Sequence, residues 1–325
     1  MAGFIIRRSI SLMFVMIVVS MVVFYLMSLV PGGPFSYGER GYTEEAMRAV
    51  RHKYGLDQPV TVRYWKYISH AAQLDFGNSL AVAGNPPVLE VIRRTWPVTL
   101  QLGLYTIIFS FSLGLSMGMA AAYYRNTWID NLVTFVAMLG YAVPNFIVAT
   151  WFLLIFGYQL GWGKPSQWII GPFFGHGQAL LSKDYILPVV TYGLAPLALV
   201  ARYTRACVSD ALIADYVRTA RAKGLTDRRI TLAHVLRNAL IPMITVLLPQ
   251  IPNLLTGSLF IEVVYGIPGL GKFFVTSIFN RDYPMIMAVV LLIALLWGVT
   301  YLLTDLLYVW VDPRVRLPGS AGGSS

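Results

Sequence analysis

The sequence predicts an all-α membrane protein with six transmembrane helices, because its composition and its long uncharged segments both favour lipid over water. Of its 325 residues, 57% are apolar and only 12% are charged, whereas a soluble domain is about 45–50% apolar and about 25% charged. The charged residues are clustered, so long tracts carry no charge at all. Such tracts are hard to reconcile with a water-soluble core.

Six hydrophobic segments each approach the roughly 20 residues needed to cross the bilayer core. They cover about 9–30, 97–124, 132–157, 185–201 with an extension toward 208, 239–264 and 285–311. The first follows Arg7 and Arg8, as the core of a signal peptide would. Its apolar run is too long for a signal peptide and no A-x-A-like cleavage site follows, so we expect an uncleaved helix.

Several of these segments contain proline. We expect Pro97 to lie in the first turn of the second helix, and Pro144 to kink the third. The fifth contains Pro242, Pro249 and Pro252, so we expect it to be bent. A bent span either lines a water-filled path or is kinked for structural reasons alone.

The basic residues predict an orientation. The short loops and terminal segments on one side hold 13 Lys and Arg residues, and the short loops on the other side hold four. The remaining eight lie in the loop 31–96, and loops longer than about 60 residues count little in the positive-inside rule. We therefore expect both termini to be cytoplasmic and this long loop to be extracytoplasmic.

The long loop contains two expected elements. Thr43 can cap a helix that begins with acidic residues, ends near Lys53 and stops at Gly55, which matches the helix dipole. The second element is the aromatic-rich segment 64–68. It suits a headgroup-level membrane interface, which we favour, or a docking partner.

The sequence does not contain a recognisable catalytic set. The segment 266–272 fits G-x-x-x-x-G-K, but Phe273 stands where a phosphate loop needs Ser or Thr, so we interpret it as a glycine-rich turn. The four histidines are scattered, and the single Cys207 cannot form an intrachain disulfide. We predict no catalytic residue, metal site or cofactor in this chain.

Acidic residues in the predicted spans are functional candidates by default. Asp305 lies on the sixth segment, where it either reaches the cytoplasmic surface or pairs with Arg202 or Arg205. Glu262 lies near the outer end of the fifth segment and is a candidate to face an entry path. For each acid, the sequence leaves open a structural ion pair or a transport role.

The densest basic run, 218–237, lies between two hydrophobic segments, which argues against nucleic-acid binding despite the net charge of +10. A helix over 210–225 would place three charged residues near one face, namely Asp215, Arg218 and Arg221. Its apolar face would contain Leu212, Tyr216, Ala220 and, more loosely, Val217. Gly224 is a natural stop. Such a helix lies on the membrane or docks on another protein.

Here the sequence resembles a known family. The runs 215–225 (DYVRTARAKGL) and 234–242 (HVLRNALIP) closely resemble the B-type permease subunit of bacterial dipeptide, oligopeptide and nickel ABC importers. Further matches follow in order along nearly the whole chain. They are Arg7-Arg8, Pro31-Gly32-Gly33-Pro34, Tyr54-Gly55-Leu56-Asp57-Gln58-Pro59, Asp75-Phe76-Gly77-Asn78-Ser79, Pro97-Val98-Thr99-Leu100, Ala201-Arg202-Tyr203-Thr204-Arg205, Pro268-Gly269-Leu270-Gly271, Arg281-Asp282-Tyr283-Pro284 and Asp312-Pro313-Arg314. Each match alone is weak, but together they are highly specific.

The resemblance implies a type I ABC importer permease fold in a bacterial inner or plasma membrane. Residues 1–30 would form the cytoplasmic N-terminus and first helix, and residues 31–96 the extracytoplasmic loop. Residues 97–311 would form the core permease domain, which includes a cytoplasmic coupling helix at about 210–225. Residues 312–325 would form a cytoplasmic tail.

The resemblance also implies the partners and a mechanism. The chain would pair with a homologous second permease subunit, and two ATPase subunits would bind ATP and Mg²⁺ outside this chain. An extracytoplasmic binding protein would deliver the solute, and closure of the ATPase pair would alternate access to a central path. The implied contact residues are Asp215, Tyr216, Arg218, Thr219, Ala220, Arg221, Ala222, Lys223, Gly224 and Leu225. Arg202, Arg205, Glu262 and Asp305 are candidates for the path, the gate or ion pairs.

Two departures from the family pattern leave details open. The wider superfamily starts this loop with Glu-Ala-Ala, but here Arg218-Thr219-Ala220 replaces the acidic start, while Gly224 keeps its place. The ATPase side chain that meets Arg218 is therefore undefined. Gly33 stands where relatives commonly carry Asp, from which we expect a modest effect on the outer loop.

Peptides are the leading substrate by resemblance, with nickel chelates, glutathione or another small solute such as a sugar as alternatives. A different class of function is an ion-coupled secondary transporter. That function would require paired ionisable residues near the bilayer midplane and usually an inverted repeat, and the sequence shows neither.

Overall fold

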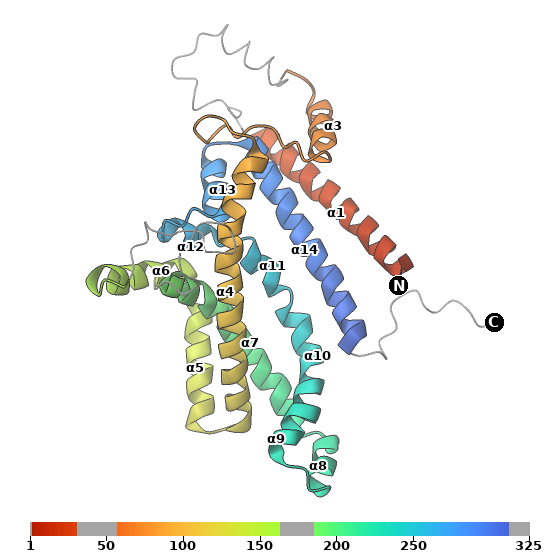
Figure 1. The fold of residues 1–325 in the computed structure, drawn as a ribbon, viewed down its shortest axis with the longest axis vertical. Coiled ribbons are helices and arrows are strands. Elements are labelled where there is room, and N and C mark those ends of the chain that lie inside the picture. The colour runs from red at the N-terminus through yellow and green to blue at the C-terminus, as the bar shows by residue number, and fades with distance from the viewer. Residues whose placement is uncertain (1, 31–56, 163–184, 312–325) are drawn as a thin grey trace, which may run out of the picture. The chain divides into compact units, whose positions relative to one another are not determined.

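The computed structural model describes residues 2–30, 57–162 and 185–311, and these residues fold almost entirely into helices (Figure 1). The chain divides into two compact units. Unit 1 comprises Met1–Pro97 with Gly269–Gly298, and unit 2 comprises Val98–Pro268 with Val299–Ser325. The expected helix after Thr43, the 31–34 motif and the tail 312–325 lie outside the described residues.

The structure confirms five of the six predicted apolar spans as helices or helix series long and apolar enough to cross a membrane, within the described ranges. The third predicted span is a broken pair of helices, which makes a sixth if the pair is counted as one span. The continuous spans are α1 (Ala2–Leu29), α4 (Val88–Tyr123), α7 (Ile186–Leu212) and α14 (Tyr283–Val311). The interrupted fifth span contains α10 (Leu236–Leu247), α11 (Gln250–Leu255) and α12 (Leu259–Val264).

Two proline predictions were wrong in detail. α4 begins at Val88, so Pro97 lies inside the helix and not in its first turn. Pro144 does not kink the third span but breaks it. Val143 directly precedes Pro144, and proline disfavours helical backbone angles in the residue before it. Val143 is therefore extended, and α5 (Trp128–Ala142) ends just before it. The chain then turns by 99° into α6 (Asn145–Phe152) and the π-helix η1 (Leu153–Gln159).

In unit 1, a buried carboxylate fixes the loop that precedes α4. Asp282 is fully buried before α14 and accepts hydrogen bonds from the Ser79 hydroxyl at 2.5 Å and the Ala81 amide at 3.1 Å. The Met285 amide also donates to it at 3.3 Å, so the same carboxylate caps the first turn of α14. Ser79 and Asp282, 203 residues apart, come from two of the motifs that carry the family resemblance.

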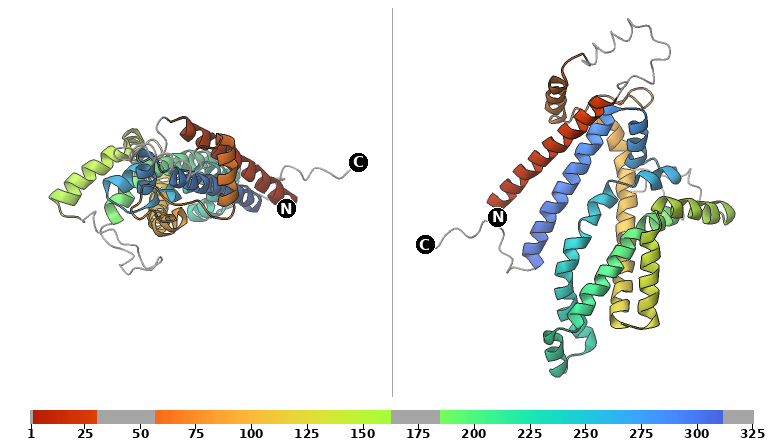
Figure 2. Two further views of the ribbon diagram at one scale, coloured as in Figure 1. Left: turned by 90° about the horizontal axis from the view of Figure 1, so that it is seen from above. Right: turned by 180° about the vertical axis from the view of Figure 1, so that it is seen from behind.

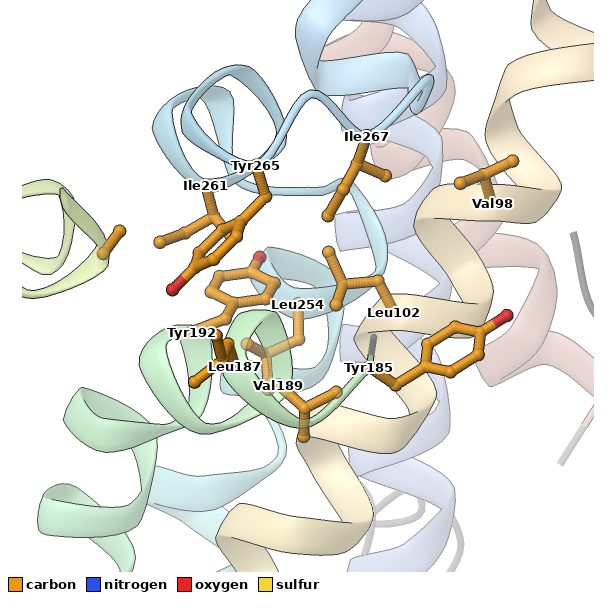
Figure 3. Close-up of a cluster of buried hydrophobic side chains, with 11 residues drawn as sticks. Val98, Leu102, Tyr185, Leu187, Val189, Tyr192, Leu254, Ile261, Tyr265 and Ile267 are labelled. Atoms are coloured by element: carbon orange, nitrogen blue, oxygen red, sulfur yellow. The ribbon is translucent and has the colours of Figure 1, made fainter. Parts of the chain in front are cut away.

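Unit 2 has a core between α4, α7 and the interrupted fifth span (Figure 3). Its labelled side chains include Leu102, Tyr192, Leu254 and Tyr265. The Tyr192 hydroxyl donates to the Asn253 carbonyl at 2.9 Å. That carbonyl lies in the last turn of α11, where helical partners run out, so Tyr192 satisfies a backbone group freed by the break in the span.

α4 and α11 approach closely in this core at a glycine. A Cβ atom built on Gly103 would lie only 2.3 Å from the Leu254 carbonyl oxygen. Small residues let backbones approach in transmembrane helix packing. Position 103 therefore has room only for glycine.

An ion pair joins α5 to α7 in the same unit. The Arg205 guanidinium binds Asp130 through two nitrogens, with Nη2 at 2.7 Å from Oδ2. The Asn126 amide donates to the same carboxylate at 3.0 Å. The side chain of Asp130 is only 4% exposed and that of Arg205 is 34% exposed. Bidentate pairs of this kind fix the relative position of two elements.

We expect Asp130→Asn to destabilise the protein by about 2 kcal/mol, because it leaves the Arg205 charge without its partner. The estimate is below the roughly 3–5 kcal/mol typical of fully buried pairs, since Arg205 keeps contact with solvent. Thermal unfolding of the purified protein in detergent measures the loss. Glu90→Gln is the matched control: it breaks the exposed Glu90–Arg94 pair, which is worth about 0.3–0.5 kcal/mol. Equal losses in the two variants would show that the Asp130 pair does not stabilise the fold.

Candidate functional site

The basic segment after α7 forms two short helices, α8 (Asp215–Ala222) and α9 (Asp227–Ile230). Both lie at the end of α7 and α10 that points away from α12, as the two side views show (Figures 1 and 2). α9 continues through the π-helix η5 (Thr231–Val235) into α10. α8 is therefore held between two spans of the same unit.

The predicted helix over 210–225 exists in two pieces. α7 ends at Leu212, Ile213 and Ala214 intervene, and α8 starts at Asp215. This break changes which residues face inward, so the predicted apolar face was partly wrong. Val217 is fully buried and Ala220 is 5% exposed, whereas Tyr216 is 38% exposed.

The inward face of α8 packs on an apolar cluster built from α4, α7, α9, η5 and α10. In addition to Val217 and Ala220, its buried members are Ala122, Val200, Val208, Ala211, Ile230, Val235, Ala239, Met243 and Leu247. The partly buried Leu212 and Leu225 pack against it at the two ends of α8. The cluster fixes α8 to the spans on both sides.

Gly224 ends α8 in the way the sequence predicts. Its φ of +74° lies in the left-handed region, and its amide donates to the Arg221 carbonyl at 2.9 Å. The Leu225 amide then reaches back to the Ala220 carbonyl at 3.3 Å. Bonds of this kind, followed by a hydrophobic residue, close a helix C-terminus around glycine.

The outward face of α8 is charged and open. The side chains of Asp215, Arg218 and Arg221 are 95%, 74% and 55% exposed, respectively. Arg218 lies 3.5 Å from Asp215, and Arg221 lies 3.7 Å from Asp227. These exposed pairs contribute little to stability. The outward face is therefore available for contact with another protein.

The other candidate residues do not gather at one site. Arg205 binds Asp130, and the Arg202 guanidinium lies 5.8 Å from the ring centroid of Tyr141 and 5.7 Å from that of Tyr203. The structure thus gives both arginines partners other than Asp305, which is half-buried on α14. Arg202 and Arg205 help line a groove of about 470 Å³ between α5 and α7 that is otherwise mainly apolar.

Glu262, a candidate for the path or an ion pair, is buried inside the packing of unit 2. It is fully buried in the first turn of α12. The Thr99 hydroxyl donates to its carboxylate at 2.8 Å and so connects α12 to α4. Thr99 belongs to the 97–100 motif of the resemblance.

Sequence reasoning missed Asp130. It precedes the predicted start of the third span, so it was not counted as an acid in the membrane region. The one feature of the sequence that could have drawn attention to Asp130 is its position in the first turn of α5, where the helix dipole favours an acidic residue. Nothing in the sequence pairs it with Arg205, 75 residues away.

Comparison with known proteins covers almost the entire chain. The N-terminal family of binding-protein-dependent transport system membrane components matches residues 1–103, and the family of binding-protein-dependent transport system inner membrane components matches residues 114–317. Among curated proteins, the dipeptide transport system permease protein DppB of Lactococcus lactis is 37% identical and aligns with 98% of this chain and 100% of its own length. The oligopeptide permease OppB of Escherichia coli is also 37% identical, over 97% of this chain and 100% of its own.

Two further relatives extend the comparison. The glutathione transport system permease protein GsiC of Salmonella paratyphi A is 37% identical over 97% of this chain and 99% of its own. A structure of the MetNI methionine ABC transporter in an inward-facing conformation covers 69% of this chain and 97% of its own, with a TM-score of 0.53 and 18% identity. At that identity the likeness shows the fold alone. The chain therefore belongs to the family of binding-protein-dependent transport system inner membrane components.

Proposed function

We propose that this protein is the permease subunit of an ATP-driven importer of dipeptides or oligopeptides. The observation that supports this most directly is its 37% identity, over nearly the full length, to permeases named for dipeptide and oligopeptide transport. The chain forms half of a translocation path with a homologous subunit. Two cytoplasmic ATPases hydrolyse ATP, and an extracytoplasmic binding protein delivers the peptide. This subunit itself catalyses no reaction.

In this proposal α8 is the coupling helix. Its charged outward face, defined by Asp215, Arg218 and Arg221, contacts a groove on the ATPase, as amphipathic helices do in groove recognition. Its inward face, Val217 and Ala220, passes the displacement to α7 and α10 through the shared cluster. Gly224 sets the length and end of the helix.

We also propose that the groove between α5 and α7 lines part of the path. Arg202 contributes an exposed cation there, held between two tyrosine rings, and within the described residues it has no ion-pair partner. Intramembrane cations in such positions mark substrate pathways by default. The free carboxylate of a peptide is the ligand group that this cation suits.

GsiC supplies a second candidate substrate. Glutathione is itself a small peptide with free carboxylates, so the same path would accept it. Uptake of labelled dipeptide, hexapeptide and glutathione into vesicles containing the assembled transporter separates these cargoes. Transport without ATP that collapses with the proton gradient would contradict the whole assignment and favour an ion-coupled carrier.

The double variant Arg218→Glu and Arg221→Glu tests the coupling role of α8. Reversing both charges on its open face should lower ATP-dependent peptide uptake at least about tenfold, because it removes the charge complementarity on which the proposed contact with the ATPase depends. The chain should keep its thermal stability, since the two affected pairs are exposed. Arg93→Glu, a reversal at an exposed position on α4, is the control and should transport normally. Normal uptake by the double variant would place coupling elsewhere.

Gly224 offers a second test of the same helix. Gly224→Val should uncouple ATP hydrolysis from uptake, because a β-branched residue resists a positive φ and the end of α8 must rearrange. Nothing lies within 4 Å of the added Cβ, so the effect is conformational and not a clash. Gly224→Asn should retain most activity, since Asn tolerates the left-handed region. Equal behaviour of the two variants would contradict the requirement for this turn.

Arg202→Gln tests the proposed path. Peptide uptake should fall several-fold while ATP hydrolysis and its dependence on α8 persist, because the substitution removes a charge on the path and leaves the coupling helix intact. Arg202→Lys should recover part of the uptake. If Gln and wild type transport at the same rate, the groove does not contact the peptide.

A further inference from the structure

Helix α3 (Val60–Ala71) of unit 1 is anchored to α1 by one buried tyrosine. Tyr64 is only 2% exposed, and its hydroxyl donates to the Ile17 carbonyl at 3.0 Å and lies 2.9 Å from the Ser20 hydroxyl. Its ring meets Phe24 edge-on, with centroids 5.6 Å apart. A helix outside the predicted spans is thus bound to the side of a span.

The contacts of Tyr64 locate α3 relative to the membrane. Arg7 and Arg8 exclude the first turns of α1 from the hydrocarbon, so the apolar stretch starts near Ser9. About 20 residues cross the core, which places its other boundary near Ser28. At a rise of about 1.5 Å per residue, Phe24 lies about 6 Å inside that boundary, Ser20 about 12 Å and Ile17 about 16 Å. The hydroxyl of Tyr64, which contacts Ser20 and Ile17, therefore reaches well into the hydrocarbon. The backbone of α3, one tyrosine side chain away, lies beside the outer half of α1 at the level of the upper acyl chains and not above its end.

The faces of α3 fit this depth. The face with Tyr64, Tyr67 and Ile68 packs on α1. At 100° per residue, one flank carries Thr61 and Trp65, and the opposite flank carries Lys66 and His70. Trp65 is 61% exposed, and Lys66 and His70 are also exposed. One flank is aromatic and the other is basic, as in helices that lie in the membrane interface.

We propose that α3 is an interfacial helix whose Trp65 flank inserts among acyl chains and whose Lys66 and His70 flank meets phospholipid phosphates. Tryptophan is enriched at this depth because its ring is apolar and its N–H is polar. α1, on which α3 packs, has widely exposed large side chains, including Phe14, Met21 and Leu26 at 67%, 40% and 57%. In a membrane span those side chains face lipid, so lipid also covers the adjoining flank of α3.

Arg63 supports this placement. Its guanidinium lies 5.8 Å from the ring centroid of Phe24. A cation over an aromatic face gains more from this contact where water is scarce, so the ring of Phe24 accommodates the Arg63 charge beside α1. The alternative occupant of the flank, a docked extracytoplasmic protein, would require Trp65 to face water before docking.

The depth of each flank is measurable by spin labelling, because Cys207 is the only cysteine of this chain. Trp65→Cys and the matched His70→Cys are made in a Cys207→Ser background, labelled with a nitroxide and reconstituted with cysteine-free partner subunits. The vesicles contain phosphatidylethanolamine and phosphatidylglycerol. Power saturation with oxygen reports lipid exposure, and saturation with a water-soluble nickel chelate reports water exposure.

At position 65, oxygen should relax the label several-fold more than the nickel chelate, and at position 70 the order should reverse. Greater chelate access at position 65, or exclusion of both reagents from it, would overturn the proposal. Protection of position 65 that appears only when the binding protein is added would also overturn it, in favour of a docking surface. A check without cysteine substitutions compares the quenching of tryptophan fluorescence by brominated lipid in the wild type and in Trp65→Phe. The wild type should be quenched more, and equal quenching of the two proteins would count against insertion. None of these readings depends on which solute is transported.

Discussion

The constraint that shapes this protein is that backbone polar groups in hydrocarbon must find partners within the chain. Continuous helices such as α1 and α14 meet it by their own hydrogen bonds. The broken spans cannot, so side chains complete the bonding at the breaks. Tyr192 donates to the Asn253 carbonyl where α11 ends, and the Ser258 hydroxyl accepts from the Ile261 amide where α12 begins. The interruptions are thus built into the packing and are not local defects.

The polar contacts of unit 2 serve the same end at longer range. Asp130 with Arg205 connects α5 to α7, and Thr99 with Glu262 connects α4 to α12. An unpaired charge in this environment would cost several kcal/mol, so each pair holds one helix in a defined position against another. Together with the close approach at Gly103, these contacts leave each element few alternative positions.

Hydropathy and charge predicted the helical spans because a helix that crosses the bilayer needs about 20 apolar residues. Uncharged tracts of that length rarely occur by chance. The glycine at position 224 predicted the end of α8, because only glycine adopts the required φ there without cost. Hydropathy and charge could not predict the Asp130–Arg205 pair, which depends on how α5 packs on α7. They also misplaced Tyr216 and Val217, because no glycine or proline marks the end of α7 at Leu212. A helix continued across that point carries the wrong register into α8.

The observed register determines which residues of α8 are buried and which face outward. An eight-residue helix is too short to be stable alone in water, so α8 exists because Val217 and Ala220 are buried in one cluster with residues of α7, α9, η5 and α10. The same burial means that α8 cannot be displaced without displacing its neighbours. In the coupling role proposed for α8, a partner that pushes on Arg218 and Arg221 would act through α9 and η5 on α10, and through α10 on the interrupted span that continues into α11 and α12. Under this proposal, the burial that stabilises α8 is also the contact that would transmit its movement.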